Sequence, residues 1–361
     1  MKIGIITQPL RTNYGGLLQN YALQKVLSAL GHEVYTINKR HNLEGIYAEC
    51  CYRVLIFDMK QIIKKFIGRT YNLTSRKHKA LRQSCIEFVE KNIKTTEAYS
   101  NQQELQDIVR TYNFEGYVVG SDQVWRPCYS DNIYKDFLAF CQDKTDIKRI
   151  AYAASFGVND WEFNDEQTKK CRELAKLFDV ISVREDSGIE LCKEHLGVEA
   201  IHVLDPTLLL EKEDYIKLVT ERKEKKSQGN LFYYILDPSE KIEEVIKYLE
   251  QKFSFKSYST KSSPTKWLRA FIDAKIVFTD SFHGCVFSII FNKPFWVIGN
   301  KERGNARFDS LLKIFDLENR RIDVNEINKI DITESIDWER VNSIKKEWQE
   351  KSCLDKSKSK N

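Results

Sequence analysis

Short apolar runs alternate along the chain with longer segments whose apolar residues recur at helical spacing. Residues 2–7 form one such run and residues 34–37 another, and residues 17–30 between them carry helical periodicity that Gly31 closes. Residues 8–16 are predicted to be a polar turn ending in Gly-Gly. This order predicts a β-loop-α-β unit, and such units build parallel sheets with right-handed crossovers.

Three further apolar runs each stop at a small or charged cluster before a helical pattern begins. They are residues 117–119 before Gly-Ser-Asp, 150–154 before Ser-Phe-Gly, and 180–183 before Arg-Glu-Asp-Ser-Gly. The carboxyl ends of parallel strands lie along the same edge of a sheet. We therefore expect these clusters to gather at one edge.

A second series of the same kind follows a strongly charged segment. Strands are expected at 231–236, 254–258, 276–278 and 295–298, with a helix from 239 to about 253 and a polar loop at 299–305. The fold class predicted is therefore α/β, with two Rossmann-like domains of mostly parallel sheets that face a cleft. We expect these boundaries: a first domain at 1–210 with a basic helical insertion at about 45–100, a charged linker at 211–228, a second domain at 229–345, and a charged tail at 346–361.

One segment of the first domain is strongly basic. Residues 52–83 contain nine Lys or Arg and a single acid, Asp58, and the first half interleaves these charges with apolar residues. One interpretation is a solvated helical insertion packed on the first domain. The other is a basic amphipathic surface that approaches an anionic membrane or an anionic acceptor.

Composition is typical of a globular protein and excludes several classes. Hydrophobic residues make up 42% and charged residues 30% of the 361 residues, and no run of about 18 apolar residues exists to span a bilayer. The first residues read as a strand rather than a signal peptide, so we expect a cytoplasmic protein. At a net charge of +5, acids nearly balance bases, and no global nucleic-acid signature exists. Nine cysteines without C-x-x-C spacing favour buried free thiols over disulfides or zinc.

A histidine stands where a predicted buried strand turns into a predicted buried helix. Residues 276–278 are β-branched or aromatic, residues 279–284 around His283 are small and polar, and apolar residues resume at helical spacing from Val286. Open α/β sheets bind ligands at such strand ends. The exposed N–H groups of the following helix favour anions, so His283 is the first candidate functional residue.

Seven segments in order resemble the polysaccharide pyruvyl transferase family, over residues 1 to about 320. They are 13–24 (NYGGLLQNYALQ), 120–125 (GSDQVW), 152–157 (YAASFG), 182–185 (SVRE), 205–207 (DPT), 279–284 (TDSFHG) and 306–308 (ARF). The resemblance implies a fold similar to that of the GT-B glycosyltransferases. It also implies transfer of the enolpyruvyl unit of phosphoenolpyruvate onto two hydroxyls of one sugar, giving a cyclic pyruvate ketal and phosphate. The long basic insertion departs from the family pattern.

The resemblance and the chemistry of phosphoenolpyruvate together select two arginines. This donor carries a phosphate and a carboxylate, and a guanidinium can hold either anion in two parallel hydrogen bonds. Arg184 follows a first-domain strand, and Arg307 follows the polar loop of the second domain. The structural alternative for Arg184 is a pair with the acids that follow it at a helix start. Lys301 or Arg303 could substitute for Arg307.

Ketal formation requires a general acid, because a proton must reach the methylene carbon to create the centre that the sugar hydroxyl attacks. His283 can hold either protonation state near neutral pH, and a nearby phosphate favours the charged form. The side chain could instead clamp the phosphate, or be a neutral imidazole bonded to a backbone carbonyl in a core turn. His195 and His202 lie in helical and strand patterns without such a cluster, and we interpret them as structural.

The segment 120–125 supplies the candidate base. Asp122 could accept the proton of the acceptor hydroxyl, and Trp125 could offer an apolar face to a sugar ring. The structural alternative is an aspartate that caps the following helix. Ser121 in the same segment and Ser281 beside the histidine are further candidate substrate-binding residues.

The first β-α loop supplies the last candidates. It contains Asn13, Tyr14, Gly15 and Gly16, and missing glycine side chains let backbone N–H groups approach a ligand. The chain has no G-x-G-x-x-G, so no dinucleotide is inferred, and no His or Cys spacing indicates a metal site. Asp280 is expected to hold its own turn.

Three functions remain open. The first is an enzyme that pyruvylates a sugar of a cell-surface polysaccharide or its lipid-linked precursor, with phosphoenolpyruvate as donor, no cofactor, and possible peripheral contact with anionic membrane at the inner membrane face through 52–83. The second is a GT-B-type glycosyltransferase that uses a nucleotide sugar. The third is a non-catalytic member of a polysaccharide-assembly complex, which the cationic candidates argue against. The acceptor sugar is not encoded in these patterns.

Overall fold

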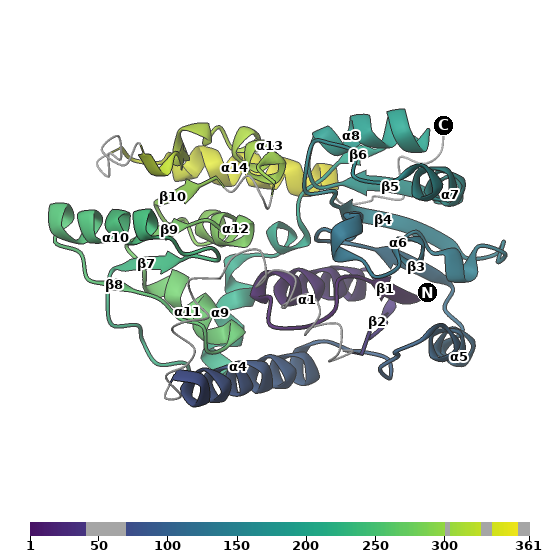
Figure 1. Ribbon diagram of the computed structural model, residues 1–361, viewed down its shortest axis with the longest axis horizontal. Helices are drawn as coiled ribbons and strands as arrows, with labels where there is room; N and C mark the ends of the chain where they lie inside the picture. The colour runs from purple at the N-terminus through teal and green to yellow at the C-terminus, as the bar shows by residue number, and fades with distance from the viewer. Residues whose placement is uncertain (41–69, 300–303, 326–333, 353–361) are drawn as a thin grey trace.

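The computed structural model describes residues 1–40, 70–299, 304–325 and 334–352, and it contains two sheets that lie side by side (Figure 1). The first sheet has the strand order β2-β1-β3-β4-β5-β6 and the second β11-β10-β9-β7-β8, and the paired strands run parallel in both. The predicted α/β fold with two parallel sheets is therefore confirmed.

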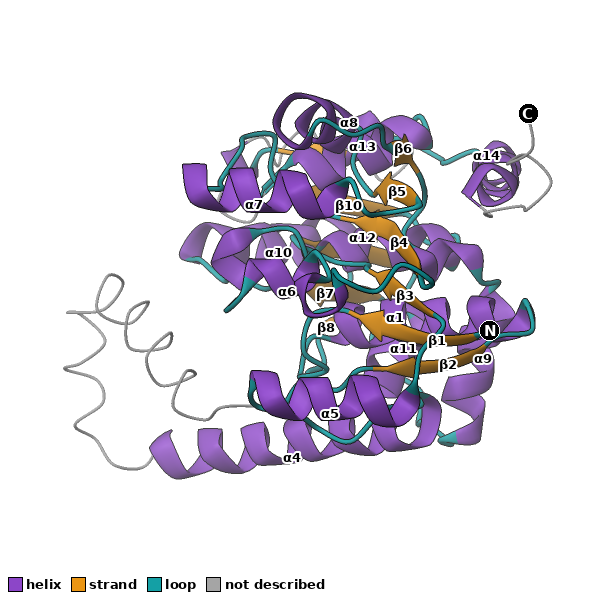
Figure 2. Cartoon of the chain, turned by 90° about the vertical axis from the view of Figure 1, so that its right-hand side faces the viewer, coloured by secondary structure: helices purple, strands orange, loops and turns teal. Residues whose placement is uncertain are grey.

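The first sheet is built from the first half of the chain. Its strands are β1 (Lys2–Ile6), β2 (Glu33–Thr36), β3 (Gly116–Val119), β4 (Lys148–Ala154), β5 (Val180–Val183) and β6 (Ile201–His202). The helices of this half are α1 (Tyr14–Ala29), α4 (Thr70–Asn92), α5 (Gln102–Tyr112), α6 (Ile133–Asp136), α7 (Asp165–Ala175) and α8 (Ser187–Leu191). Short turns of helix also occur at η2 (Pro127–Tyr129), η3 (Ala139–Cys141), η4 (Cys192–Leu196) and η5 (Pro206–Leu209). Helices cover both faces of the sheet in Figure 2.

The second sheet repeats the plan with fewer strands. Its strands are β7 (Leu231–Tyr234), β8 (Ser257–Tyr258), β9 (Ile276–Thr279), β10 (Phe295–Ile298) and β11 (Arg321–Ile322). The accompanying helices are α9 (Lys212–Glu221), α10 (Glu240–Phe253), α11 (Pro264–Asp273), α12 (Phe282–Ile290), α13 (Ala306–Ile314), η6 (Glu318–Arg320) and α14 (Trp338–Ser352).

The strand order creates a switch point in each sheet. In the first sheet the chain moves from β1 to β2 on one side and then returns to place β3 on the other side of β1. In the second sheet β8 and β9 flank β7 in the same way. Ligands of open α/β sheets bind outside the carboxyl ends of strands at such points. The loops that follow β1, β3 and β9 are therefore the places where a site is expected.

Helix α1 begins earlier than its apolar pattern indicates. Residues 14–16 were predicted to lie in a polar turn, but α1 starts at Tyr14 because the side chain of Asn13 caps it and accepts a hydrogen bond from the N–H of Gly16. The pair of glycines therefore lies in the first helical turn.

The segment predicted as a charged linker is not an extended connection. Helix α9 occupies most of it, and Tyr215, Leu218 and Val219 are buried because one face of the helix packs against α11. The charges lie on the other face, which explains the polar composition. Helix α14 then returns from the second half to the first, where Ser352 Oγ accepts a hydrogen bond from the N–H of Leu204.

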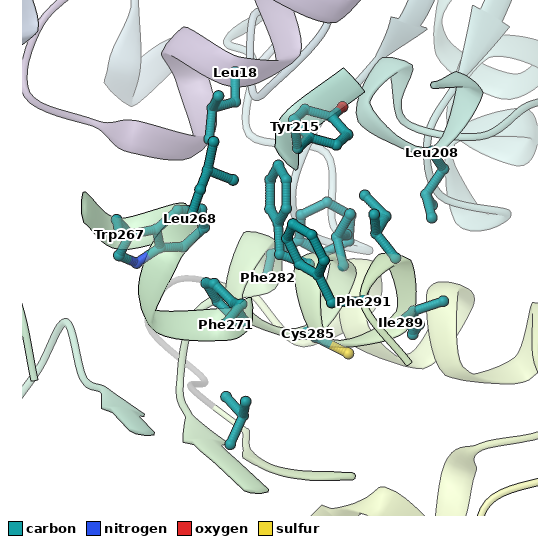
Figure 3. Close-up of a cluster of buried hydrophobic side chains, with 14 of the residues drawn as sticks. Leu18, Leu208, Tyr215, Trp267, Leu268, Phe271, Phe282, Cys285, Ile289 and Phe291 are labelled. Carbon is teal, nitrogen blue, oxygen red and sulfur yellow. The ribbon is translucent and has the colours of Figure 1, made fainter. Parts of the chain in front are cut away.

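The largest apolar cluster joins the two halves. Leu18 of α1, Leu208 of η5 and Tyr215 of α9 pack with Trp267 of α11 and Phe282 of α12 (Figure 3). Separate clusters lie within each half. One side of the junction between the sheets is therefore a continuous hydrophobic core.

The basic insertion is described only in part. Residues 41–69, which hold most of the predicted basic surface, lie outside the described residues, and α4 follows them. Cys85 and Phe88 of α4 join the shared core, and the helix contacts both α1 and α11. In the part of the chain that the structure describes, no helix is both long enough and apolar enough to cross a bilayer.

Candidate functional site

Charged side chains from both sheets meet where the two switch points face each other. Asp122 follows β3, Arg184 follows β5 and Asp205 precedes η5, whereas His283 and Arg307 lie in the first turns of α12 and α13. Each of these side chains belongs to a residue that is no more than 6% exposed. The sequence-predicted candidates His283, Arg184, Arg307 and Asp122 are thus brought together from opposite halves.

Asp205 is the centre of this cluster, although it was not among the candidates. Its Oδ1 accepts hydrogen bonds from the N–H of Thr207 at 3.0 Å and from Thr207 Oγ1 at 2.7 Å. Its Oδ2 lies 2.8 Å from Arg184 NH1 and 3.6 Å from His283 Nε2. Burial alone would raise the pKa of this carboxyl, but His283, Arg184 and Thr207 outweigh burial and hold the pKa well below its ordinary value. Asp205 is therefore a fixed negative charge.

Arg184 is held by two carboxylates. Besides Asp205, its NH2 group contacts Asp122 Oδ1 at 3.3 Å. Burial alone would lower the pKa of this guanidinium, but the two carboxylates raise it above its ordinary value. The predicted structural alternative named the acids that follow Arg184, whereas the partners come from other loops. The arrangement fixes a cation at the junction.

Asp122 is engaged on both oxygens. Oδ1 accepts hydrogen bonds from Arg184 and from the N–H of Gln123 at 3.0 Å, and Oδ2 lies 3.3 Å from Asn13 Nδ2. Its backbone adopts a left-handed φ of 69°, a conformation that aspartate tolerates better than most residues. Burial opposes ionisation, yet Arg184, His283 and Arg307 lower the pKa of Asp122. A low pKa makes this carboxylate a weak base near neutral pH, so its contacts favour a role in holding Arg184.

His283 lies against the amino end of α1 from the other half. Ser281 caps α12 by accepting a hydrogen bond from the N–H of Gly284, which places His283 in the first turn as predicted. A Cβ at Gly15 would be only 2.1 Å from His283 Nδ1. From the sequence, the missing side chain of Gly15 was expected to let a ligand approach the backbone. In the structure the imidazole ring of His283 occupies that space. Gly15 is therefore required by a contact between the two halves.

Both arginines lie close to one phenyl ring. The guanidinium carbon of Arg184 is 4.5 Å from the centroid of Phe282, and that of Arg307 is 5.5 Å from it. Burial and the charge of Arg184 lower the pKa of Arg307 to about 10, despite the opposing effect of Asp122 and Glu185. Both guanidinium groups are charged near neutral pH, and a cation whose pKa is lowered in this way is stabilised by an added anion.

Two more residues belong to the cluster and were missed. Glu185 is completely buried, and its Oε1 accepts hydrogen bonds from Ser155 Oγ at 3.0 Å and from the N–H of Gly157 at 2.8 Å. Tyr129 is partly buried and close enough to Arg307 to raise its pKa. Glu185 follows a strand end directly and could have been found by that signal, whereas Tyr129 lies after an irregular loop.

Trp125 does not face a ligand. Its residue is fully buried, its ring stacks on Phe137 with centroids 4.7 Å apart, and its Nε1 donates a hydrogen bond to the carbonyl of Asp136. The predicted sugar-binding face is wrong because this ring belongs to the core of the first half.

The remaining candidates support the cluster from outside. Ser121 Oγ lies 3.4 Å from Asp205 Oδ2, and Tyr14 packs on Trp267 with ring centroids 5.8 Å apart. Gly16 completes the cap of α1. Asp280 accepts hydrogen bonds from the N–H groups of Leu236 and Asp237, so it holds the segment that follows β7.

The two other histidines that were interpreted as structural lie outside the cluster. His195 stacks on Trp161 with ring centroids 4.5 Å apart. His202 contacts the carbonyl oxygen of Arg184 at 3.0 Å and Ser310 Oγ of α13 at 3.1 Å. Among the described residues, no group of three or more His, Cys, Asp or Glu side chains is arranged to hold a metal ion.

Comparisons with known proteins complete the description. The model of the family described as polysaccharide pyruvyl transferase matches residues 13–302, which is most of the chain. A comparison with curated proteins found no match. Among solved structures, the chain is similar to UDP-GlcNAc 2-epimerase from Methanocaldococcus jannaschii in complex with UDP-GlcNAc and UDP, with 11% identity over 97% of this chain and 93% of that chain and a TM-score of 0.49. It is also similar to a glycosyltransferase from Rickettsia africae, with 10% identity over 97% and 92% of the two chains and a TM-score of 0.43.

Proposed function

The chain belongs to the polysaccharide pyruvyl transferase family, and from that premise we propose that it transfers the enolpyruvyl group of phosphoenolpyruvate onto two hydroxyls of a sugar. The products are a cyclic pyruvate ketal on the sugar and inorganic phosphate. The acceptor is a sugar, an oligosaccharide or a lipid-linked saccharide of a cell-surface polysaccharide such as an exopolysaccharide.

The pair of guanidinium groups beside the ring of Phe282 is the observation that carries this proposal. Phosphoenolpyruvate has two anionic groups, and Arg184 and Arg307 provide two cations at one place, beside His283. The guanidinium fork matches both phosphate and carboxylate. Because burial and the charge of Arg184 lower the pKa of Arg307, this cation gains most from an added anion.

The chemistry proceeds by addition to the double bond of the enol phosphate and then by loss of phosphate. A proton adds to the methylene carbon, the adjacent carbon becomes oxocarbenium-like, and the first sugar hydroxyl forms a bond to it while losing its proton. The carbon–oxygen bond to phosphate then breaks, and the second hydroxyl closes the ketal with loss of a second proton. One of the two released protons restores the general acid, and the phosphate takes up the other. No oxidant or reductant is needed, so acid-base groups and cations are sufficient.

His283 is the group that we assign to the proton on the methylene carbon. Asp205 faces Nε2 of the imidazole, and Gly15 lies against Nδ1, so the ring is held between the two halves. Asp122, the base expected from the sequence, serves mainly to orient Arg184. Because these side chains are so deeply buried, substrates reach them when the halves separate at this edge.

Titration calorimetry with phosphoenolpyruvate tests the proposal. Arg307→Ala is expected to weaken binding by about tenfold or more. Arg320→Ala is the matched control, because Arg320 is equally buried and stacks over Trp296 at 4.9 Å, at the opposite, amino-terminal end of β10. Wild-type protein that binds no phosphoenolpyruvate at millimolar concentration but binds UDP-N-acetylglucosamine would instead favour the nucleotide-sugar alternative.

His283→Asn separates the two roles of the imidazole. If His283 donates the proton, this variant binds phosphoenolpyruvate within a few-fold of wild type but releases no phosphate when acceptor is present. If the imidazole is a phosphate ligand, affinity itself falls. Loss of affinity equal to that of Arg307→Ala would contradict the assignment as general acid.

A further inference from the structure

Glu185 is buried beside the cluster, and one of its oxygens has a clear task. Oε1 accepts hydrogen bonds from Ser155 Oγ and from the N–H of Gly157, and so it fixes the turn that follows β4. Oε2 is buried without a hydrogen-bond partner among the described residues. Burying a carboxylate in this way is costly, so the position demands an explanation.

The turn that Glu185 fixes is the docking surface for the opposite half. Gly304 has φ of +86°, and a Cβ there would lie 1.9 Å from the carbonyl oxygen of Gly157. The two backbones therefore touch with no room for a side chain between them. Gly157 is itself constrained, since its φ is +79° and a Cβ would be 2.1 Å from Gln123 Oε1.

The docked backbone leads directly to Arg307. Asn305 is the N-cap of α13, and Arg307 follows in the first turn, three residues after Gly304. The same helix is held again at Ser310, whose Oγ accepts a hydrogen bond from the N–H of Asp186, the residue after Glu185. The segment after β5 thus holds α13 directly, through Asp186 and Ser310, and indirectly, through the Gly157 turn that Glu185 fixes.

We propose that Glu185 is a positioning residue that places Arg307 in the anion site, by holding the Gly157 turn against Gly304 of the opposite half. The inference rests on the proposed function for the role of Arg307, whereas the contact of the Gly157 turn with Gly304 is seen in the structure itself. Its oxygen acts as a hydrogen-bond acceptor, and proton transfer is not its task.

Glutamine and alanine at position 185 distinguish this role from others. Glu185→Gln keeps an oxygen that accepts from Ser155 and Gly157, so phosphoenolpyruvate affinity is expected within about threefold of wild type. Glu185→Ala removes the acceptor, and affinity is expected to fall about tenfold. If the glutamine variant folds as wild type but loses as much affinity as the alanine variant, the charge of Glu185 is what matters, and the positioning role is overturned.

Hydrogen exchange gives a readout that does not depend on the ligand. We expect faster amide exchange in residues 304–314 of Glu185→Ala but not of Glu185→Gln, because the docking contact is lost only in the former. A role confined to the first half would speed exchange around 155–157 and leave 304–314 unchanged, which would overturn the proposal. If wild type binds no phosphoenolpyruvate, the proposed function fails. The exchange measurement still tests whether Glu185 holds the Gly157 turn against Gly304.

A milder variant covers the case in which Glu185→Ala does not fold. Ser155→Ala removes one of the two donors and keeps the Gly157 contact. We expect affinity to fall two- to threefold, which in binding free energy is about a third to a half of the loss expected for Glu185→Ala. Amide exchange at 304–314 should rise less than in Glu185→Ala. If both affinity and exchange are unchanged in Ser155→Ala, the Gly157 turn does not position Arg307, and the proposal is contradicted.

Discussion

At the scale of single residues, the contact between Gly15 and His283 shows why one position accepts only glycine. The imidazole occupies the space that a Cβ at position 15 would need, although the two residues come from different halves. The backbone of Gly15 lies in an ordinary helix, so the restriction comes from the space and not from the conformation. The contact with His283 therefore explains the glycine at position 15, which the sequence had suggested was there to bind a ligand.

Gly15→Ala is expected to destabilise the protein by about 1–3 kcal/mol, because an overpacked site must shift its neighbours. Gly16→Ala is the matched control in the same helical turn, because the nearest atoms that its Cβ would meet belong to the side chain of Asn13, at 3.2 Å and beyond. Urea unfolding of both variants measures the difference.

The double variant Gly15→Ala/His283→Ala makes the cause of that cost explicit. Removal of the ring makes room for the new methyl group, so the cost of Gly15→Ala should largely disappear in this background. Additive costs in the double variant would show that the ring is not the obstacle.

Several site residues were predicted from the sequence, and others were misjudged for identifiable reasons. His283 was found because it follows a strand, and the ends of parallel strands converge in any sheet of this kind. Arg184 and Asp122 also follow strands, but they were selected through the family resemblance and the chemistry of the donor. Asp205 was recognised only as part of a motif, since its importance depends on the approach of α12 from the other half. Trp125 was misjudged because its burial depends on Phe137, which no local pattern reveals.

At the scale of elements, the middle of α13 is held by a polar contact centred on His202. Nε2 of this histidine lies 3.0 Å from the carbonyl oxygen of Arg184 and 3.1 Å from Ser310 Oγ, so it joins β6, β5 and α13. Burial lowers the pKa of His202 below its ordinary value of 6.5. The backbone carbonyl of Arg184 and the carboxylate of Asp186 raise this pKa, and Lys351 and Lys313 lower it, but burial is the largest effect. The folded protein therefore keeps this imidazole neutral to a lower pH than the unfolded chain does.

The lowered pKa gives a pH dependence with a defined sign. As the pH falls below about 6.5, the unfolded chain binds a proton at position 202 and the folded protein does not, so the unfolded state is favoured and stability decreases. His202→Gln keeps a polar nitrogen but does not titrate, so its stability should fall less between about pH 7 and about pH 5.5. Melting temperatures across this range test the difference, with His195→Gln as control; equal slopes for wild type and His202→Gln would contradict it.

The elements themselves were predicted well where local signals were strong. Strands β1, β3, β5, β9 and β10 were each found from a short apolar run that stops at polar residues. The start of α1 and the whole of α9 were not, because both are set by interactions that apolar periodicity does not show. A capping asparagine extends α1, and a packed face hidden among charges forms α9.

At the scale of the whole molecule, the two halves are joined differently on different sides of the charged cluster. Leu18 of α1 and Trp267 of α11 lie in a shared apolar core to which Phe308 of α13 also belongs, and α13 adds polar contacts with the first half at Ser310 and at the exposed pair of Lys313 with Asp186. Water can replace polar contacts at low cost, but it cannot replace apolar ones. We therefore expect the polar contacts of α13 to separate before the shared core does.

A core shared in this way also predicts how the protein unfolds. Two halves with separate cores would unfold in two steps. Here, if one half unfolds, the other is left with its part of the shared core exposed to water, so the two halves are expected to unfold together. We expect the described part of the chain to give one calorimetric transition, in which the measured enthalpy equals the van't Hoff enthalpy.

Three leucine-to-alanine variants test that single transition. Leu105 belongs to the cluster of the first half, Leu249 to that of the second, and Leu18 to the shared core, and all three are almost completely buried. Each substitution should cost about 2–5 kcal/mol. If the halves are one unit, every variant lowers the same transition without splitting it. If Leu105→Ala lowers one transition and Leu249→Ala another, the halves unfold independently, and the shared core is not the element that holds the charged cluster together.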